Sequence, residues 1–353
     1  MPPRRRKRLD PSVFNLPVEQ IKQGYYTDIY FVRAREIARQ EKRGSVVTMQ
    51  FSAKNDGWLS GIDECVALLK TCADDWNALT VNALYEGDRY DTWDTVMTVE
   101  GPYESFGYLE TILLGALCRR TRVCTAAKRL CEAAQSKPVI FFGARDDVFS
   151  TQPGDGFAAM VGGVKMVSTE AQASFFGGTA VGTIPHALIA ALGGDTVKAT
   201  KKFAELYPDV EVIALVDYDN DCVKTSLDCA RALEDRLWGV RLDTSESLVD
   251  KSVVPQMGTF HPTGVNANLV WNVRNALDAE GFGDVKIVVS GGFDVPRILA
   301  FEEVQVPVDA YGVGAALFDG RFDFTADVVQ LNGKPQAKVG RALRENPRLE
   351  RVK

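Results

Sequence analysis

The position of His186 makes it the first candidate for chemistry in this sequence. Residues 182–187 read as a strand end followed by the start of a helix, with Pro185 suited to the first helical position. His186 is then expected in the first turn, where the positive end of the helix favours neutral imidazole and would stabilise a phosphoryl group on it. A histidine so placed can act as a nucleophile or a phosphate ligand, or it can simply pack or cap the helix. The other histidine, His261, precedes Pro262 in a loop-like stretch and is expected to be structural.

Acidic residues follow the apolar run at 213–216. Asp217 comes directly after this run, and a carboxylate at a strand end could orient the His186 imidazole or hold a magnesium ion. We interpret Asp217 as that carboxylate. Asp219, or Asn220 beside it, is expected to cap the following helix instead.

Two further strand ends carry groups that suit an anionic or aromatic ligand. Arg241 and Asp243 lie on one side of the strand that they end. Together they could hold a phosphorylated sugar and its hydroxyls, although such a pair also forms ordinary salt bridges. Phe142 and Arg145 follow another apolar run, where a ring and a guanidinium could hold a planar ring that bears a carboxylate. In isolation this second pair would be an ordinary strand end.

Paired glycines follow the last two expected strands of this part of the chain. Gly291 and Gly292 come after Ser290, and Gly312 and Gly314 lie at the end of the next strand. Backbone N–H groups in such loops can approach a phosphate closely, and the loops after late strands are the usual phosphate site of an α/β barrel. Either motif alone would be an ordinary turn. Their occurrence after successive strands predicts a phosphate site.

A repeated strand, loop and helix unit must position these residues from about residue 130 onward. Amphipathic helical stretches, such as 195–206 and 223–237, separate short apolar runs, which is typical of βαβ folds. The runs that we expect to be strands are 138–142, 164–167, 180–184, 212–216, 239–242, 285–290 and 310–313. About seven such units predict a parallel sheet that closes or nearly closes into a barrel.

The two ends of the chain predict a second domain. Strands near 26–32 and 96–99, with long helices around 62–76 and 108–117, indicate an α+β domain before the barrel. Near the C-terminus, apolar runs at 322–331 and 336–339 flank Asn332-Gly333, which predicts a hairpin. The expected division is a basic tail at 1–10, an N-terminal α+β domain at 11–130, an irregular or incomplete α/β barrel at 131–318, and strands at 319–353 that complete the N-terminal domain.

The composition limits the class of protein. The chain has 353 residues, of which 46% are hydrophobic, and no run approaches the roughly 20 apolar residues of a membrane span. Without an apolar N-terminal stretch, the expected location is the cytoplasm. Seven cysteines without a CxxC pair argue against a disulfide framework and a structural zinc site. The net charge of −6 argues against general nucleic-acid binding, and the cations from Arg4 to Arg8 are expected to form a solvated, disordered tail.

Together these motifs resemble those of the nicotinate phosphoribosyltransferase family, the type II phosphoribosyltransferases that also include nicotinamide and quinolinate phosphoribosyltransferases. The resemblance covers nearly the whole chain, and so many motifs in one order are specific where each alone is not. It rests on Gly24-Tyr25-Tyr26-Thr27-Asp28-Ile29-Tyr30, Gly101-Pro102-Tyr103, Leu109-Glu110-Thr111, Phe142-Gly143-Ala144-Arg145, residues 182–187, Arg241-Leu242-Asp243, Ser290-Gly291-Gly292, Tyr311-Gly312-Val313-Gly314 and the ending from Phe322 to Lys338.

The resemblance implies transfer of phosphoribose from phosphoribosyl pyrophosphate to nicotinate, with magnesium and coupled ATP hydrolysis. The products would be nicotinate mononucleotide and pyrophosphate. In that scheme His186 is transiently phosphorylated and Asp217 orients it. Phe142 and Tyr30 would stack on the pyridine ring, and Arg145 would bind its carboxylate. Tyr30 would come from the partner subunit of a homodimer or higher homo-oligomer with shared active sites.

The resemblance also implies how the phosphoribosyl donor is held. Arg241 and Asp243 would bind the donor, and Thr183 would contact substrate. The Ser290-Gly291-Gly292 loop and the Gly312 to Gly314 loop would bind its 5′-phosphate. No side chain is expected to be a dedicated metal ligand.

Two departures from the family pattern leave alternatives open. Asp146 stands where many members have a second arginine, which changes the charge around the substrate carboxylate. Relatives of the archaeal kind can end in a cysteine-rich metal knuckle, whereas this chain has no cysteine after Cys229, so no structural zinc is expected. The alternatives are a quinolinate phosphoribosyltransferase, which needs no ATP but a larger cationic cluster, and a non-catalytic relative that binds a nucleotide or a partner.

Overall fold

A computed structural model describes residues 7–41 and 45–352, and the chain divides into two compact units. The first unit comprises Met1–Lys128, Pro153–Gly162 and Phe318–Lys353, and the second comprises Arg129–Gln152 and Gly163–Leu317. The expected domain boundaries near 130 and 318 lie close to the observed boundaries at 128/129 and 317/318. Residues 153–162, which were expected in the barrel, belong to the first unit instead. Within the described ranges, no helix is both long enough and apolar enough to cross a membrane.

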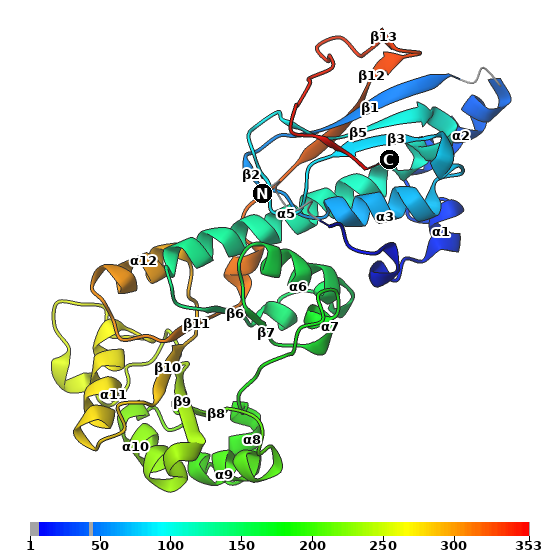
Figure 1. The fold of residues 1–353 in the computed structure, drawn as a ribbon. Helices are drawn as coiled ribbons and strands as arrows, with labels where there is room; N and C mark the ends of the chain where they lie inside the picture. The colour runs from blue at the N-terminus through cyan, green and yellow to red at the C-terminus, as the bar shows by residue number, and fades with distance from the viewer. Residues whose placement is uncertain (1–6, 42–44, 353) are drawn as a thin grey trace, which may run out of the picture. The chain divides into compact units, whose positions relative to one another are not determined.

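An antiparallel sheet forms the centre of the first unit (Figure 1). Its strand order is β13-β12-β1-β5-β3-β14, with the bounds β1 (Val46–Ala53), β3 (Thr80–Ala83), β5 (Thr95–Pro102), β12 (Phe324–Leu331), β13 (Lys334–Pro335) and β14 (Glu350–Arg351). A separate pair consists of β2 (Gly57–Trp58) and β4 (Arg89–Tyr90). The helices are α1 (Val18–Lys22), α2 (Ile29–Glu41), α3 (Ile62–Cys72), α4 (Tyr103–Phe106), α5 (Glu110–Ala133) and α6 (Gln152–Val161), of which α5 ends and α6 begins within the second unit.

The two faces of this sheet are covered in different ways. Alternate residues of β1, such as Met49 and Phe51, are buried in an apolar core to which α3 and α5 contribute. The polar residues between them face the C-terminal segment, because Gln50 Oε1 accepts a hydrogen bond from Arg344 N at 2.7 Å. Thr95 Oγ1 donates to the Arg344 carbonyl at 2.6 Å. The C-terminal strands therefore complete the N-terminal unit, as the sequence predicts.

One predicted strand of the first unit is wrong. Residues 26–32 do not form a strand but lead into helix α2 (Ile29–Glu41). The start of this stretch, Ile29-Tyr30-Phe31-Val32, favours a strand in isolation. The residues that follow are mostly good helix formers such as Arg, Ala, Glu and Gln, and a helix propagates cooperatively once it has begun.

The predicted C-terminal hairpin is confirmed, with a shorter second strand. Asn332 and Gly333 have φ values of 49° and 73°, and a type I′ turn requires positive φ at both central residues. The strand after the turn is Lys334–Pro335 rather than 336–339. Val339 is 98% exposed, so it has no apolar contact that would extend the pairing.

The predicted basic tail is only partly within the described residues, because 1–6 lie outside them. Arg8 contradicts the prediction of a solvated tail. Its Nη1 donates to Asp63 Oδ1 at 2.8 Å, its Nη2 donates to the Leu84 carbonyl at 2.8 Å, and its guanidinium lies 4.2 Å from the Tyr85 ring centroid. Asp63 is buried, and a buried carboxylate requires a partner. Arg8 is therefore a structural residue of the first unit.

A parallel sheet with the strand order β7-β6-β11-β10-β9-β8 forms the second unit. Its strands are β6 (Val139–Phe141), β7 (Met166–Val167), β8 (Val212–Leu215), β9 (Leu237–Leu242), β10 (Lys286–Val289) and β11 (Ala310–Val313). The helices are α7 (Glu170–Ala173), α8 (His186–Ala191), α9 (Thr196–Leu206), α10 (Cys222–Leu233), α11 (Ala267–Ala279) and α12 (Val295–Glu303). The curled sheet is an incomplete barrel, which confirms the predicted fold class.

The strand predicted at 180–184 is wrong. Only Ala180 forms a bridge, to Val167, and residues 181–185 are an irregular connection that leads into α8. Gly177 and Gly178 precede the stretch and Gly182 lies within it, and glycine weakens a strand. His186 is therefore held by the start of a helix and by its neighbours, not by a strand end.

Glu110, at the start of α5, gives the first unit a testable pH dependence. Burial raises the pKa of Glu110 to about 7, and the carboxylates of Asp327 and Asp28 add to the shift. An acid with a raised pKa in the folded state binds more protons when folded, so stability is lost as the pH rises from about 4.5 to about 7. Glu110→Gln is expected to raise the free energy of unfolding by roughly 1 kcal/mol at about pH 8, after allowance for solvent screening.

Urea unfolding of both proteins at about pH 8 and about pH 4 measures this effect. At the lower pH the wild-type carboxyl is protonated, so the two proteins should have equal stability. Glu86, whose pKa is also raised to about 7 by burial, leaves part of the pH dependence in the variant. An equal gain at both pH values would mean that the charge of Glu110 is not the cause.

Candidate active site

The carboxyl ends of neighbouring strands bring five of the predicted residues to one edge of the second unit. Phe142 follows β6, Gly314 follows β11, Ser290 follows β10, Asp243 follows β9 and Asp217 comes shortly after β8. These strands are parallel neighbours, so their carboxyl ends lie at the same edge. The βα pattern in the sequence thus delivers these side chains to a common site.

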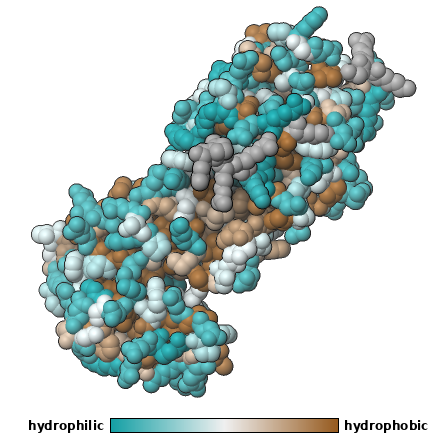
Figure 2. Space-filling view, in the orientation of Figure 1, coloured by the Kyte–Doolittle hydropathy of each residue, from teal (hydrophilic) through white to brown (hydrophobic). Residues whose placement is uncertain are grey.

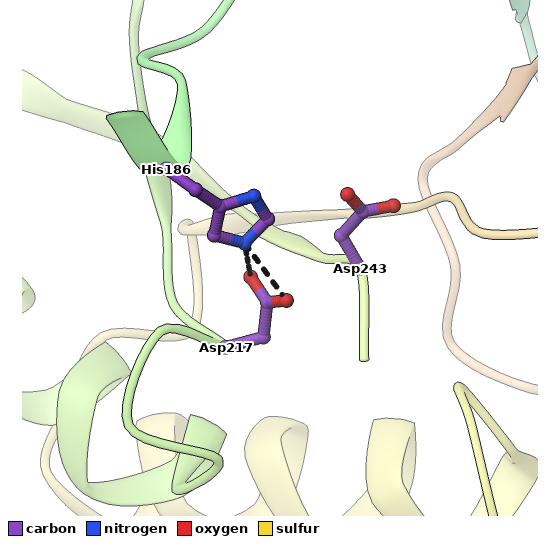
Figure 3. Close-up of side chains that lie close together, drawn as sticks. All are labelled: His186, Asp217 and Asp243. Carbon is purple, nitrogen blue, oxygen red and sulfur yellow. Dashed lines mark hydrogen bonds and ion pairs between the residues drawn. The ribbon is translucent and has the colours of Figure 1, made fainter. Parts of the chain in front are cut away.

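His186 and Asp217 form a hydrogen-bonded pair (Figure 3). His186 Nε2 lies 3.0 Å from both carboxylate oxygens of Asp217. The His186 side chain is 45% exposed, whereas that of Asp217 is 7% exposed. Burial raises the pKa of Asp217, and the neighbouring His186 opposes that shift. Helix α8 has only six residues, so the carboxylate is the stronger electrostatic partner of the imidazole.

This contact decides which ring nitrogen of His186 is free to react. An ionised carboxylate only accepts hydrogen bonds, so the network assigns a hydrogen to Nε2, and in the neutral imidazole the lone pair is then on Nδ1. In Figure 3 Nδ1 points away from Asp217. Nδ1 is therefore the ring nitrogen of His186 that Asp217 does not engage.

Asp243 is the junction of a second set of contacts. Ser290 Oγ donates to Asp243 Oδ1 at 2.7 Å, and Arg241 Nη2 donates to Asp243 Oδ2 at 3.3 Å. Burial lowers the pKa of Arg241, and its Nε has no hydrogen-bond partner among the described residues. The Arg241 guanidinium also lies 5.5 Å from the centroid of the Phe142 ring. Arg241 therefore keeps unused donors next to an aromatic ring, which suits an anionic ligand.

Gly312 has a role that the sequence did not predict. It lies inside β11, and a Cβ placed on it would be 2.4 Å from Phe142 Cε2 and 3.2 Å from Ser290 Cβ. The absence of a side chain leaves room for the Phe142 ring against the strand. Gly312 is therefore explained by packing, whereas its predicted contact with a phosphate stays a prediction.

The loop after β10 has the backbone geometry that a close anion contact needs. Gly291 and Gly292 have φ values of 86° and 73°, which favour glycine. Arg297 Nη1 donates to the Gly291 carbonyl at 2.6 Å, and the Glu246 carboxylate lies only 2.1 Å from where a Cβ of Gly292 would be. No local sequence pattern marks Arg297 or Glu246, because both reach this loop through tertiary contacts.

The remaining predicted residues are less tightly held. Arg145 is exposed at the end of a short 3₁₀ turn. Asp146 Oδ2 lies 2.9 Å from where a Cβ of Gly314 would be. Thr183 lies in the connection before α8, where its Oγ1 donates to the Ile184 carbonyl at 3.4 Å. Tyr30 belongs to α2 in the first unit and is 59% exposed.

The predicted helix cap after β8 needs correction. The residue that caps α10 is Asp221, whose side chain accepts from Lys224 N, and not Asp219 or Asn220. Asn220 adopts a φ of 53° and donates through Nδ2 to the Val249 carbonyl at 2.7 Å. The turn thus places the cap one residue later than the sequence suggests, because Asn220 is used to make the turn itself.

His186, Asp217 and Asp243 are close enough to share a cation. One ligand atom from each lies within 4.8 Å of the others. Mg²⁺ prefers oxygen and is usually bound by one or two carboxylates together with substrate phosphates, so Asp217 and Asp243 fit such an ion. The His186 nitrogen nearest Asp217 already carries the hydrogen of that contact and is a poor ligand. Asp217 and Asp243 are therefore the residues of this cluster that could hold such an ion, although no dedicated ligand was expected.

The chain is similar to known phosphoribosyltransferases. Residues 28–121 match the family described as quinolinate phosphoribosyl transferase, N-terminal domain. The nicotinate phosphoribosyltransferase pncB1 of Mycobacterium tuberculosis is 30% identical over 280 residues, which are 76% of this chain and 57% of that protein. A second protein of that organism, pncB2, is 26% identical over 82% of this chain and 56% of its own length. The chain thus spans little more than half the length of these curated relatives.

Solved structures extend the similarity to most of the chain. The nicotinate-nucleotide pyrophosphorylase from Pyrococcus furiosus is 36% identical, with a TM-score of 0.79, and the match covers 93% of this chain and 80% of that one. The human nicotinic acid phosphoribosyltransferase, at 18% identity and a TM-score of 0.69, shares the fold over 88% of this chain and 76% of that one. The residues at the strand ends, the incomplete barrel and these similarities agree, and the chain belongs to the type II phosphoribosyltransferase family of nicotinate and quinolinate phosphoribosyltransferases.

Proposed function

We propose that this chain transfers phosphoribose from phosphoribosyl pyrophosphate to nicotinate in the synthesis of pyridine nucleotides. The pyridine nitrogen forms a bond to C1′ of the ribose, and pyrophosphate leaves with the bonding electrons. The observation that carries the proposal is the His186–Asp217 pair at the same sheet edge as Asp243 and the glycine loop at 291–292. The transfer of phosphoribose does not itself require a histidine paired with a carboxylate. A member of this family that couples the transfer to phosphorylation of a histidine does require such a pair.

The substrate would lie between Phe142 and the donors of the same edge. The Phe142 ring is suited to stack on the pyridine, and Arg145 is available for its carboxylate. Arg241 is suited to bind an anionic oxygen of the phosphoribosyl donor, because its buried Nε has no hydrogen-bond partner among the described residues. Asp243, held by Ser290, is suited to accept from ribose hydroxyls.

We also propose that the reaction is coupled to ATP hydrolysis through Nδ1 of His186. The lone pair on Nδ1 would form a bond to the γ-phosphorus of ATP while ADP leaves, and water would later release phosphate from the histidine. Asp217 supports this step because it keeps the hydrogen on Nε2 and stabilises the charge that develops on the ring. Bound magnesium supplies positive charge next to the phosphates, and Asp217 and Asp243 are the residues that would hold it.

A homodimer or higher homo-oligomer with shared active sites is part of this proposal. The segment before and at the start of α2 exposes Tyr25, Tyr26, Ile29 and Tyr30, with Tyr25 at 73% and Tyr30 at 59%. Exposed aromatic residues in such a group are typical of an interface. Tyr30 would then stack on the pyridine bound by the partner.

Quinolinate phosphoribosyltransferase is the second candidate, favoured by the family match over residues 28–121. Its substrate has two carboxylates and would need a surplus of cations around the ring. The charges that act on the Arg241 guanidinium, which lies 5.5 Å from the Phe142 ring centroid, are the carboxylates of Asp217 and Asp243 and the guanidinium of Arg145, so the cations are not in surplus. This balance favours the monocarboxylate nicotinate.

An assay of both acids with phosphoribosyl pyrophosphate tests the proposal. We expect nicotinate mononucleotide and pyrophosphate from nicotinate, and release of carbon dioxide from quinolinate would instead establish the second candidate. Binding of nicotinate without any product would indicate a non-catalytic relative.

Incubation with γ-labelled ATP tests the coupling. Label is expected on the wild-type protein and not on His186→Ala, and it should be lost in acid and kept in alkali, as for a phosphoramidate. Label of equal intensity on both proteins, or on neither, would contradict a phosphoryl group on His186.

A further inference from the structure

Gln152 and Thr169 connect two loops of the active-site edge through a chain of hydrogen bonds within the second unit. Gln152 Nε2 donates to the Ala144 carbonyl at 3.1 Å, and Thr169 Oγ1 donates to Gln152 Oε1 at 3.0 Å. Ala144 lies in the loop after β6, and Thr169 lies in the loop after β7. Since β6 and β7 are neighbours in the sheet, the chain ties together the ends of adjacent strands.

The direction of each hydrogen bond in this chain is determined. Thr169 Oγ1 accepts from Gln172 N at 3.1 Å, so its own hydrogen is left to donate to Gln152. Gln172 is almost fully buried, and its Oε1 accepts from Ser168 N at 3.0 Å and from Thr169 N at 3.2 Å, which completes a capping box on α7. The capping box therefore orients the amide of Gln152 so that its NH₂ group faces Ala144.

The loop that receives this contact carries Arg145, whose direction depends on the backbone. Phe142 is fixed independently, because its N–H donates to the Val313 carbonyl at 2.8 Å and its ring packs against Gly312. Arg145 is exposed and has no hydrogen bond or ion pair within the described ranges. Each of the two peptide groups that flank Arg145 makes a hydrogen bond. In the peptide after it, Asp146 N donates to the Gly143 carbonyl at 3.1 Å, and in the peptide before it the Ala144 carbonyl accepts from Gln152.

We propose that Gln152 is a positioning residue for the substrate carboxylate, acting through the Ala144 carbonyl on Arg145. The proposal rests on nicotinate as the substrate. Without the amide donor, the peptide between Ala144 and Arg145 is free to rotate, and a displacement of about 1 Å in a substrate-positioning group can lower activity by about 100-fold. The affinity for nicotinate should fall, whereas the affinity for the phosphoribosyl donor should not. The residues proposed to bind the donor, Arg241, Ser290 and Asp243, are not part of this chain of hydrogen bonds.

Gln152→Glu is the sharpest test, because it keeps the size and the acceptor for Thr169 but places a carboxylate against the Ala144 carbonyl. We expect the KM for nicotinate to rise by about 10- to 100-fold while the KM for phosphoribosyl pyrophosphate changes by less than about 2-fold. Thr169→Val, which removes the donor to Gln152, should shift the nicotinate KM in the same direction. Thr169→Ser keeps both hydrogen bonds and should behave as the wild type.

The outcomes separate this proposal from the proposed function. A wild-type protein that does not use nicotinate would overturn both. A wild-type protein that does, with an unchanged nicotinate KM in Gln152→Glu, would overturn only the positioning role. If both KM values rose together and the melting temperature fell in Gln152→Glu and Thr169→Val, the chain of hydrogen bonds would be merely structural, which also contradicts the proposal.

Discussion

Asp217→Asn is expected to lower ATP-coupled turnover by about 10²- to 10⁴-fold while the protein stays folded. Asp217 accepts from His186 Nε2 at 3.0 Å and so leaves the lone pair on Nδ1. An asparagine in the same place can donate its NH₂ group to Nε2, which moves the ring hydrogen to Nδ1. The nitrogen that should attack the γ-phosphorus would then have no free lone pair, and the stabilising negative charge would also be absent.

The stability of this variant makes the test specific. Burial raises the pKa of Asp217, which means that the folded protein holds the ionised carboxylate at an energetic cost. The neutral asparagine has no such cost, so its melting temperature should equal or exceed that of the wild type. Labelling with γ-labelled ATP and steady-state turnover are the measurements. Unchanged kinetics would remove Asp217 from the mechanism, and a loss of activity matched by unfolding would make its role structural.

Gly312→Ala is expected to lower kcat/KM for nicotinate by about 100-fold or more. The added methyl group would be 2.4 Å from Phe142 Cε2 and 3.2 Å from Ser290 Cβ, and atoms at such distances must move apart. The Phe142 ring is the part that can yield, and its shift would displace the surface that is proposed to stack on the pyridine.

A second substitution shows whether the effect of Gly312→Ala is steric. Phe142→Leu removes the ring atoms that the new methyl group would meet, so the double variant should recover stability relative to Gly312→Ala alone. Activity should not recover, because the ring that stacks on the pyridine is missing. Equal melting temperatures for Gly312→Ala and the double variant would mean that contact with Phe142 is not the source of the destabilisation, while a Gly312→Ala protein as active as the wild type would contradict the packing role of this glycine.

The sequence alone was sufficient for features that depend on short stretches of chain. Alternation of short apolar runs with amphipathic helices predicted the parallel sheet. The residues at the ends of those runs, Asp217, Asp243 and Ser290, are found at one sheet edge. The Asn332-Gly333 turn was predictable because two residues with positive φ are a local requirement. The carboxyl ends of parallel strands lie at one edge of the sheet whatever the strand order. The sequence could therefore predict that these residues lie at the same edge without the strand order being known.

Only the tertiary structure decided which of these groups touch and how each is held. Residues 26–32 begin a helix, and 180–184 form a connection instead of a strand, because neighbouring residues and packing outweighed local propensity. The contacts of Gly312 with Phe142 and of Thr169 with Gln152 arise because β6 lies between β11 and β7, an order that no local pattern encodes. The reactive nitrogen of His186 also depends on the tertiary structure, although the sequence predicts that this residue is reactive. Its nucleophilic nitrogen is assigned only by the Asp217 carboxylate, which lies 31 residues further along the chain.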